Sequence, residues 1–412
     1  MNKSPRLVAL ETLYSIFYDG SYSNIVLDKA LSDIKENKAF ISALVYGVTE
    51  RKITLDYFID KYAQGRIKPK VRIVLWLGAY QLLFMDKVPS SASINESVKL
   101  VKEIKQDYYS KLVNAVLHKI DNDRQIPDDL SVKYSVPENL INMWKKQYGE
   151  DVLNEFLPCI NDKPPLFAIP NKKFVNSDEL LYELECDGIL GEAYDEFVLI
   201  ENANDLTDSK AFKNGLFYIE DLSSFNCANA LDALGDDLVL DMCSAPGGKA
   251  FTISQSMNNS GKIYCYDLHE HRLNLIKNSA KRLSIDNIYT EVNDATVYNE
   301  NIPKADKILC DVPCSGFGII RRKPEIRYKD LDSVKDLPQI QYKILETSSR
   351  YLKDGGRIIY STCTLNKKEN ENVVNKFLKD HSGYKLLKDK TVFPSTVGGD
   401  GFYYAIMVKN EN

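Results

Sequence analysis

Apolar residues recur at helical spacing through the first 125 positions of the chain. Leu7, Leu10 and Leu13 lie on one helical face, and Ser4-Pro5 before them is typical of an N-cap followed by a first helical residue. The same spacing predicts further helices over 24–34, 40–62, 70–84, 94–104 and 109–120. Because short polar breaks separate these segments, they predict a compact all-α domain.

From about residue 215 short apolar runs alternate with helical stretches. Runs of strand length lie at 217–219, 238–242, 262–267, 287–292, 307–312 and 357–362. Helical stretches lie between several of them and after the last, at 273–283, 337–352 and 369–379. This alternation predicts an α/β Rossmann-like domain, with a mostly parallel sheet covered on both faces. Residues 401–409 predict a final strand, antiparallel and at or near the edge.

The middle of the chain combines both patterns. Residues 121–129 are polar and contain a proline, as linkers do, and 137–160 predict two helices beginning at Pro137-Glu138. Apolar runs at 166–170 and 197–202 flank a predicted helix over 177–185, which suggests a small α/β domain. The sequence therefore predicts a multidomain chain divided into residues 1–125, 126–215 and 216–412.

Composition is that of a globular protein, with 44% hydrophobic and 27% charged residues. The first residues have no long apolar stretch of the secretory type, and no run approaches the roughly 20 apolar residues of a membrane span. The eight cysteines form no CxxC pair and have no histidine at metal-ligand spacing. We therefore expect a cytoplasmic protein with reduced thiols and no metal, and a monomer.

The charge is unevenly distributed. The whole chain carries −5, but residues 1–125 hold 19 Lys and Arg against 14 Asp and Glu, a balance of +5. Such asymmetry indicates a polyanionic partner for the basic part, or chance variation on solvated helix faces, and this count favours neither. The basic side chains include Arg51, Lys52, Arg66, Lys68, Lys70 and Arg72.

Polar residues gather at the carboxyl ends of the predicted strands, where open α/β sheets bind ligands. A single Asp after a strand is more often a turn or helix cap than a ligand contact, but four successive strand ends carry one. These residues, with the cysteine after the 357–362 strand, are Asp241, Asp267, Asp294, Asp311 and Cys363.

The turn after the 238–242 strand indicates a nucleoside ligand. Its glycines permit close backbone approach, but it is neither GxGxxG nor a P-loop, so it has no full phosphate cradle. Asp267 follows about 20 residues later, where an acidic residue hydrogen-bonds ribose hydroxyls. S-adenosylmethionine has a ribose and lacks phosphates, so it fits better than NAD. The turn consists of Cys243, Ser244, Ala245, Pro246, Gly247, Gly248 and Lys249.

Two cysteines have the surroundings of reactive groups. Cys314 lies in a Pro-Cys-Ser-Gly turn, and Cys363 follows a strand directly between two threonines. Cys243, Cys265 and Cys310 are predicted to be inert buried hydrophobes. The spacing alone leaves open whether both Cys314 and Cys363 are catalytic.

The motifs DMCSAPGGK, DVPCSGFGIIRRKPEIR, YSTCT and GGDGFYYA closely resemble those of the RNA cytosine-C5 methyltransferases. The helical first part is similar to the NusB-type domain that precedes the catalytic part in the bacterial 16S ribosomal-RNA enzymes of that family. The resemblance covers essentially the whole chain and is weakest over 126–210. The paired PCSG and TCT motifs are its specific part.

The resemblance implies a role for each site residue. Cys363 would be the nucleophile that adds to C6 of cytosine, Cys314 would help release the product, and Asp311 would hydrogen-bond the base. The turn 243–249 would hold the methionine part of S-adenosylmethionine, with Asp267 at the ribose and Asp294 near the adenine. Lys249 would meet either the cofactor carboxylate or Asp311, and both alternatives stay open.

The same resemblance implies a single-stranded or loop cytosine in 16S ribosomal RNA as substrate, because the base must leave its stack. Two alternatives remain: an RNA-binding assembly factor with a vestigial methyltransferase fold, and a transfer-RNA methyltransferase. The basic residues after PCSG either hold flanking phosphates or form a solvated loop, and the aromatic run 402–404 either stacks on RNA or packs in an edge strand. These basic residues are Arg321, Arg322, Lys323 and Arg327.

Overall fold

The computed structural model describes residues 3–202, 206–394 and 398–411, which divide into two compact units. The helical unit consists of the chain up to Asp162 together with Ile320–Leu331, and the sheet unit of Lys163–Ile319 and the chain from Asp332 onward. By packing, residues 126–162 therefore group with the N-terminal helices, and 163–215 with the sheet unit. The division into three domains at 125 and 215 stays a prediction about independent folding.

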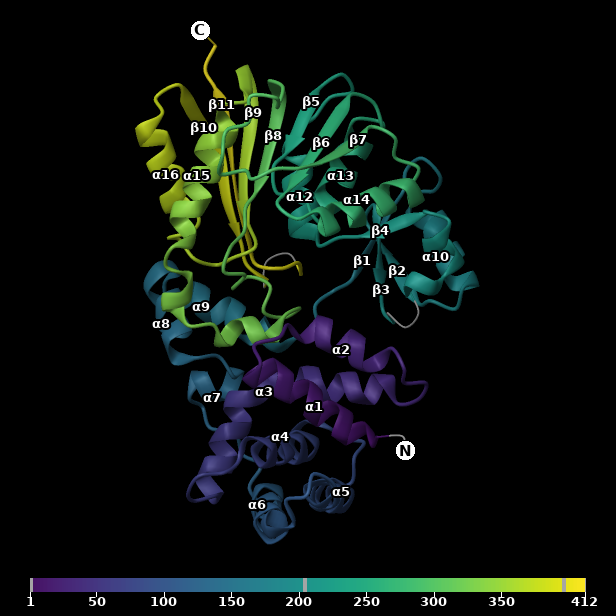
Figure 1. Ribbon diagram of the computed structural model, residues 1–412, viewed down its shortest axis with the longest axis vertical. Coiled ribbons are helices and arrows are strands. Elements are labelled where there is room, and N and C mark those ends of the chain that lie inside the picture. Colours follow the sequence, from purple (N-terminus) through teal and green to yellow (C-terminus); the bar gives the residue numbers. More distant parts are fainter. Residues whose placement is uncertain (1–2, 203–205, 395–397, 412) are drawn as a thin grey trace. The chain divides into compact units, whose positions relative to one another are not determined.

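The helical unit confirms the predicted helices to within a few residues (Figure 1). Ser4 is the N-cap of the first helix, and its hydroxyl accepts the Leu7 N–H at 3.2 Å. The apolar faces of the helices up to residue 120 form one core around Trp76 and Phe58, both buried. The helices are α1 (Pro5–Tyr18), α2 (Ser23–Leu31), α3 (Lys38–Tyr62), α4 (Pro69–Phe84), α5 (Ser90–Glu103), α6 (Ser110–Asn122), α7 (Leu130–Tyr134), α8 (Glu138–Tyr148) and α9 (Glu150–Phe156).

The sheet unit begins with a small antiparallel sheet in the order β2-β3-β1-β4. The segment 217–219 was predicted to belong to the parallel sheet, but it pairs with β1 in this small sheet, so that prediction is wrong. A three-residue apolar run has no pattern that identifies its partner, because pairing is a long-range property. The elements are β1 (Phe167–Pro170), α10 (Ser177–Cys186), β2 (Gly191–Tyr194), β3 (Phe197–Ile200), α11 (Lys210–Lys213) and β4 (Phe217–Ile219).

Within the described ranges of the chain, the main sheet has seven strands in the order β10-β11-β9-β8-β5-β6-β7. The strands from β5 to β9 are parallel, while β11 is antiparallel and next to the edge, as predicted. The edge strand β10 was not predicted, because its sequence YKLLKDKTV is largely exposed and polar. The strands are β5 (Leu238–Asp241), β6 (Lys262–Asp267), β7 (Ile288–Val292), β8 (Ala305–Asp311), β9 (Leu352–Thr362), β10 (Tyr384–Val392) and β11 (Phe402–Lys409).

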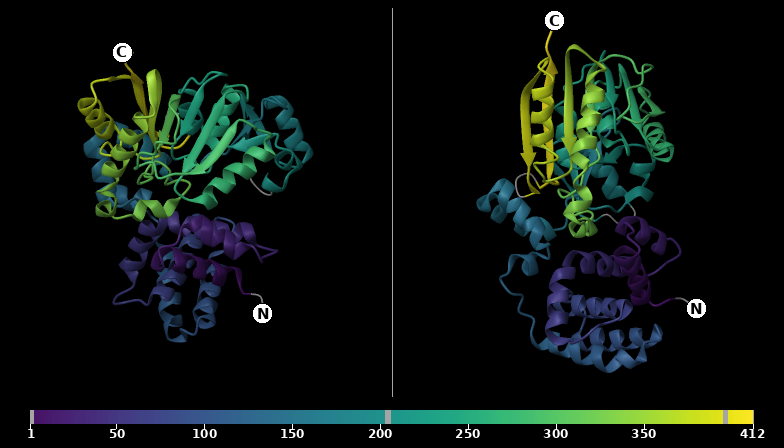
Figure 2. Two further views of the ribbon diagram at one scale, coloured as in Figure 1. Left: turned by 45° about the horizontal axis from the view of Figure 1, so that its top comes forward. Right: turned by 60° about the vertical axis from the view of Figure 1, so that its left-hand side comes forward.

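Helices cover both faces of this sheet (Figure 1 and Figure 2). Successive strand residues point to opposite faces, so Val239 packs with one set of helices and Leu240 with the other. The first set is α12 (Leu222–Asn229), α13 (Gly248–Ser256) and α14 (Glu270–Arg282). The second is α15 (Leu337–Ser349) and α16 (Glu371–Asp380). The result is the predicted Rossmann-like architecture.

No helix among the described residues is long and apolar enough to cross a membrane. Within the same residues, no group of three His, Cys, Asp or Glu side chains is arranged to hold a metal ion.

Candidate active site

The predicted polar residues lie along one edge of the main sheet, the edge formed by the carboxyl ends of its parallel strands. In the parallel pairing of β5 with β8, Asp241 lies beside Leu309, which is two residues before Asp311. In the pairing of β8 with β9, Asp311 lies beside Ser361, which is two residues before Cys363. The carboxyl ends of β5, β8 and β9 therefore converge. The sheet register thus brings together Asp241 and Cys363, which are 122 positions apart in sequence (363 − 241).

Lys249 and Asp311 form an ion pair at this edge. Lys249 Nζ donates to Asp311 Oδ2 at 2.8 Å and to Ser224 Oγ at 3.1 Å. The other carboxylate oxygen of Asp311 accepts the Ser361 hydroxyl at 2.8 Å. Of the two partners left open for Lys249, the structure shows Asp311.

The surroundings of Lys249 keep it charged. Burial would lower the pKa of this ammonium, but the nearby carboxylates of Asp311 and Glu220 outweigh burial and raise it. Glu220 itself is buried, and burial raises its pKa to about 7. The Lys249 ammonium also lies 5.3 Å from the centre of the Phe402 ring. A permanent positive charge is therefore fixed beside Asp311.

The two candidate thiols face each other. Cys314 Sγ lies 3.2 Å from Cys363 Sγ, and both side chains are partly exposed. The hydrogen bond with Cys363, together with burial, raises the pKa of the Cys314 thiol well above its usual value. Cys265 and Cys310 are fully buried, and burial also raises the pKa of each thiol, as expected for inert cysteines. Cys243, which was predicted to be buried as well, is partly exposed, so exposure alone does not distinguish the candidate pair. The short distance between the two sulfurs does.

The turn 243–249 bends toward the end of β6. The backbone N–H and the hydroxyl of Ser244 both donate to the Tyr266 carbonyl, at 2.8 and 2.9 Å. Gly247 has φ 111°, a conformation that favours glycine, and α13 begins immediately after it. Arg272 donates to the Ala245 carbonyl at 3.0 Å and pairs with the Asp267 carboxylate at 2.9 Å. One guanidinium thus joins the turn to the predicted ribose acceptor.

This edge has polar groups suited to S-adenosylmethionine. The buried Asp241 Oδ1 has no hydrogen-bond partner among the described residues, and burial raises the pKa of this carboxyl to about 8. An unsatisfied buried acceptor at the start of the turn fits a ligand that carries an ammonium and hydroxyl donors. Asp294 is exposed at the end of β7, where its carboxylate accepts the Thr296 N–H and hydroxyl at 2.9 and 2.6 Å.

For two sets of residues the sequence left RNA contact open as one of two alternatives, and most of these side chains are buried. Phe402, Tyr403 and Tyr404 are buried in the sheet, so they pack in a strand and do not offer a stacking surface. Arg327 is fully buried in the helical unit, where it donates to the Glu50 carbonyl at 2.9 Å and to Asn161 Oδ1 at 2.9 Å. It is therefore neither a phosphate ligand nor a residue of a solvated loop. Arg321 is buried as well.

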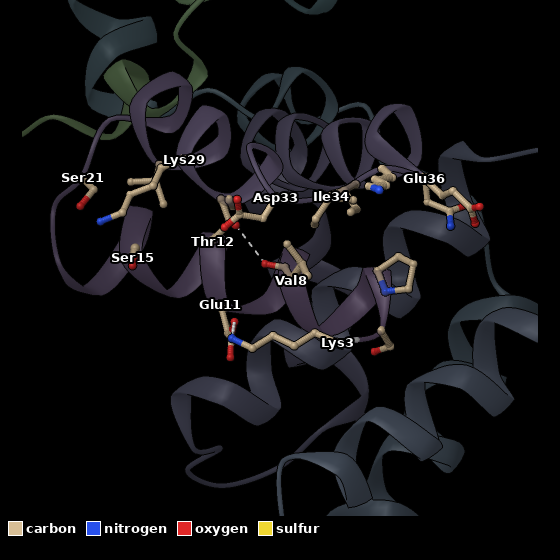
Figure 3. Close-up of a pocket in the computed structure, with 17 residues that line it drawn as sticks. Lys3, Val8, Glu11, Thr12, Ser15, Ser21, Lys29, Asp33, Ile34 and Glu36 are labelled. Carbon is tan, nitrogen blue, oxygen red and sulfur yellow. Dashed lines mark hydrogen bonds and ion pairs between the residues drawn. The ribbon is translucent and has the colours of Figure 1, made fainter. Parts of the chain in front are cut away.

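The helical unit has a groove of about 1250 Å³ between α1, α2 and the start of α3 (Figure 3). Its charged side chains have both signs, and Lys3 pairs with Glu11 at 2.6 Å. None of the predicted site residues lines it. The residues that line the groove are therefore distant in sequence from the predicted site residues.

Sequence reasoning missed the residues that hold the reactive groups in place. They are polar side chains on α12, α14 and α15, in β9 and in the turn before α16, and no motif distinguishes them from solvated surface. Most of them are buried, but Ser224 is partly buried and Arg272 is exposed, so only their contacts in the folded chain identify them. They are Ser224, Arg272, Gln341, Ser361, Glu369 and Asn370.

The fold and the arrangement of this edge define a Rossmann-like methyltransferase preceded by a helical NusB-like unit. Comparison with known families agrees. Residues 228–408 match the family model described as 16S rRNA methyltransferase RsmB/F, and residues 3–122 match the NusB family. The chain belongs to this family of ribosomal RNA small subunit methyltransferases, and its cofactor is S-adenosylmethionine, as predicted.

Individual relatives support this assignment. The chain is 33% identical to the probable ribosomal RNA small subunit methyltransferase B of Bacillus subtilis, over 98% of this chain and 99% of that one. It is 28% identical to ribosomal RNA small subunit methyltransferase B of Photorhabdus laumondii, over 98% of both. Among solved structures, the crystal structure of PH0851 aligns with a TM-score of 0.83 and 26% identity, covering 99% of this chain and 100% of that one.

Proposed function

We propose that this protein methylates C5 of a specific cytosine in 16S ribosomal RNA through a covalent bond between Cys363 and C6 of the base. The observation that carries the proposal is the pair of partly exposed thiols 3.2 Å apart, with the Lys249–Asp311 ion pair at the same sheet edge. A location in the cytoplasm fits both the ribosomal RNA substrate and the reduced thiols.

A thiol nucleophile solves a specific chemical problem. C5 of cytosine is a poor nucleophile, but addition of a thiolate at C6 turns the ring into an enamine that accepts a methyl group at C5. This is covalent catalysis, in which one difficult step becomes two easier ones. S-adenosylmethionine supplies the methyl group when it is bound.

Asp311 is suited to hold the base during the addition. Its two oxygens are fixed by Lys249 and Ser361, so the carboxylate has a set orientation at the strand end. From there it would hydrogen-bond cytosine at N3 or N4 and stabilise the addition intermediate. Lys249 would act through Asp311, because it already donates to that carboxylate.

Cys314 is suited to the release step. Its hydrogen bond with Cys363, together with burial, raises its pKa and favours the protonated thiol, so Cys314 is suited to donate to Cys363 across the 3.2 Å between the two sulfurs. After C5 loses its proton, the C6–S bond breaks and Cys363 leaves as a thiolate. The Cys314 S–H would donate to that sulfur and stabilise it as it leaves. Loss of Cys314 would therefore leave the RNA attached.

The residues for the cofactor follow from the turn and the strand ends. The backbone of residues 243–249 would hold the methionine part, and Asp267 would accept the ribose hydroxyls. Asp241 would accept a hydrogen bond from the ligand, and Asp294 would lie near the adenine. The convergence of the turn and Asp267 through Arg272 supports this placement.

Substitution of each cysteine tests the proposal. We expect Cys363→Ala to abolish 5-methylcytosine formation, and Cys314→Ala to accumulate a covalent RNA adduct on a denaturing gel. Cys186→Ala is the matched control, because Cys186 is exposed on α10, and it should behave as the native protein. Full activity of Cys314→Ala without an adduct would contradict the two-cysteine scheme.

Mapping of 5-methylcytosine in RNA from a deletion strain identifies the substrate. Loss of one modified position in 16S RNA is the expected result, whereas loss in transfer RNA would reassign the substrate class. An unchanged map, together with no binding of S-adenosylmethionine in calorimetry, would favour an assembly factor without catalytic activity.

A further inference from the structure

The turn that precedes α16 supplies two adjacent, fully buried polar residues, Glu369 and Asn370. Neither belongs to the PCSG or TCT motif. Each makes side-chain hydrogen bonds to residues next to one of the two thiols. These contacts give the turn a role in the geometry of the thiol pair.

Glu369 holds the loop that carries Cys314. Its carboxylate accepts the Ser315 N–H at 2.8 Å and the Ser315 hydroxyl at 2.6 Å. It also accepts the Gln341 amide at 3.0 Å, and the same amide donates to the Pro313 carbonyl at 3.0 Å. The residues on both sides of Cys314 are therefore fixed through one carboxylate and one amide.

The carboxylate also sets the direction of the hydrogen bonds between the two motifs. A carboxylate only accepts, so the single proton of the Ser315 hydroxyl points to Glu369. Ser315 Oγ must then accept from the Thr364 hydroxyl, which lies 2.7 Å away. Thr364 Oγ1 in turn accepts the Phe317 N–H at 3.2 Å. The PCSG loop and the residue after Cys363 are thus joined in one defined network.

Asn370 holds the segment that carries Cys363. Its amide donates to the Thr364 carbonyl at 2.9 Å, and its oxygen accepts the Thr362 hydroxyl at 2.6 Å. Asn370 is the N-cap of α16, yet it makes no side-chain cap hydrogen bond. An asparagine there ordinarily accepts a helix N–H. Here both of its polar atoms are directed instead to the neighbours of Cys363.

We propose that Glu369 and Asn370 are positioning residues that set the distance between the two thiols, Glu369 through Ser315 beside Cys314 and Asn370 through Thr362 and Thr364 beside Cys363. The inference rests on the proposed two-cysteine reaction. It predicts that each residue controls a different step, because each holds a different cysteine.

The test uses Glu369→Gln and Asn370→Asp in the full-length protein. An amide at position 369 places an NH₂ group against hydrogen-bond donors, so the Cys314 loop loses its anchor and product release slows. A second oxygen at position 370 faces the Thr364 carbonyl, so Cys363 is displaced and addition slows. We expect Glu369→Gln to accumulate RNA adduct at least about 10-fold above the native protein, and Asn370→Asp to form adduct at least about 10-fold more slowly.

A second readout needs neither RNA nor cofactor. Diamide removes two electrons and two protons from a thiol pair and joins the sulfurs as a disulfide. The Cys314–Cys363 disulfide, measured by mass spectrometry, should form at least about 10-fold more slowly in both variants than in the native protein. The matched controls are Glu300→Gln and Asn372→Asp, which change exposed residues and should leave both readouts unchanged.

The possible results separate the two proposals. If Cys314→Ala forms no adduct but both variants slow disulfide closure, the reaction scheme fails and the positioning role stands. If Cys314→Ala forms adduct while Glu369→Gln and Asn370→Asp match the native protein in both readouts, the positioning role is wrong. Should circular dichroism show that a variant is unfolded, Thr364→Val cuts the network without a buried charge, and an unchanged rate of disulfide closure there would overturn the inference.

Discussion

Lys249 Nζ lies 2.8 Å from Asp311 Oδ2, so the second residue of α13 is joined to the end of β8. This ion pair connects the turn expected to hold the cofactor with the carboxylate expected to hold the base. Because the partners are 62 residues apart in sequence, one on a helix and one on a strand, only the tertiary structure brings them together.

Replacement of Lys249 by methionine should slow methyl transfer more than it weakens cofactor binding. Methionine keeps much of the volume but leaves Asp311 without its cation, and loss of one such electrostatic contact lowers a rate by about 10²-fold. Single-turnover kinetics and calorimetry with S-adenosylmethionine measure the two effects. Lys262→Met, at an exposed position, is the control. A parallel fall in rate and cofactor affinity would show that Lys249 serves the cofactor instead.

Asp241 should make the protein less stable as pH rises. Burial raises its folded pKa to about 8 from the ordinary value of 3.8, so between these values the folded chain retains a proton that the unfolded chain releases. This contribution to stability is complete below pH 4 and is lost toward pH 8, by up to about 1.4 kcal/mol per pH unit. Urea denaturation at a series of pH values from 5 to 8 measures the free energy of unfolding. This free energy should fall less steeply with pH in Asp241→Asn than in the native protein. Equal slopes in both proteins would contradict the assignment.

Asp267→Ala should weaken binding of S-adenosylmethionine by about 10-fold or more, because hydrogen bonds to a charged acceptor contribute roughly 1.5–3 kcal/mol each. The same variant leaves the thiol pair intact, so disulfide closure by diamide should be unchanged. Asp286→Ala changes an exposed carboxylate and serves as the control. An unchanged dissociation constant in calorimetry would remove Asp267 from the cofactor site.

Arg327→Met should destabilise the helical unit by about 3–5 kcal/mol, because it leaves buried acceptors, among them the Glu50 and Ser135 carbonyls, without their donor. Thermal unfolding measures the loss, and Arg66→Met at an exposed position should have little effect. At a temperature where the variant is folded, the salt dependence of RNA binding should be the same as in the native protein. If the slope of the logarithm of RNA affinity against the logarithm of salt concentration were smaller by about one unit in the variant, Arg327 would instead contact a phosphate.

Much of the fold is predictable because local periodicity reports burial. The helix starting after Ser4 and the strand over 262–267 are both predicted correctly, since the first has apolar residues at helical spacing and the second is a short apolar run. Strand β10 and the pairing of 217–219 are not predicted. An exposed edge strand has little apolar signal, and a strand of three residues does not encode its neighbour.

The sequence by itself determined which groups are expected to carry the chemistry: a glycine turn without a phosphate cradle, an acidic residue after the next strand, and two cysteines in specific motifs. These are properties of residue type and short spacing. Only the tertiary structure decided which side chains control those groups. It gave Lys249 to Asp311, buried Arg327 among backbone carbonyls, and placed Glu369 and Asn370 behind the two thiols. Each of these contacts joins distant parts of the chain or depends on burial. A local sequence pattern specifies neither of these two properties.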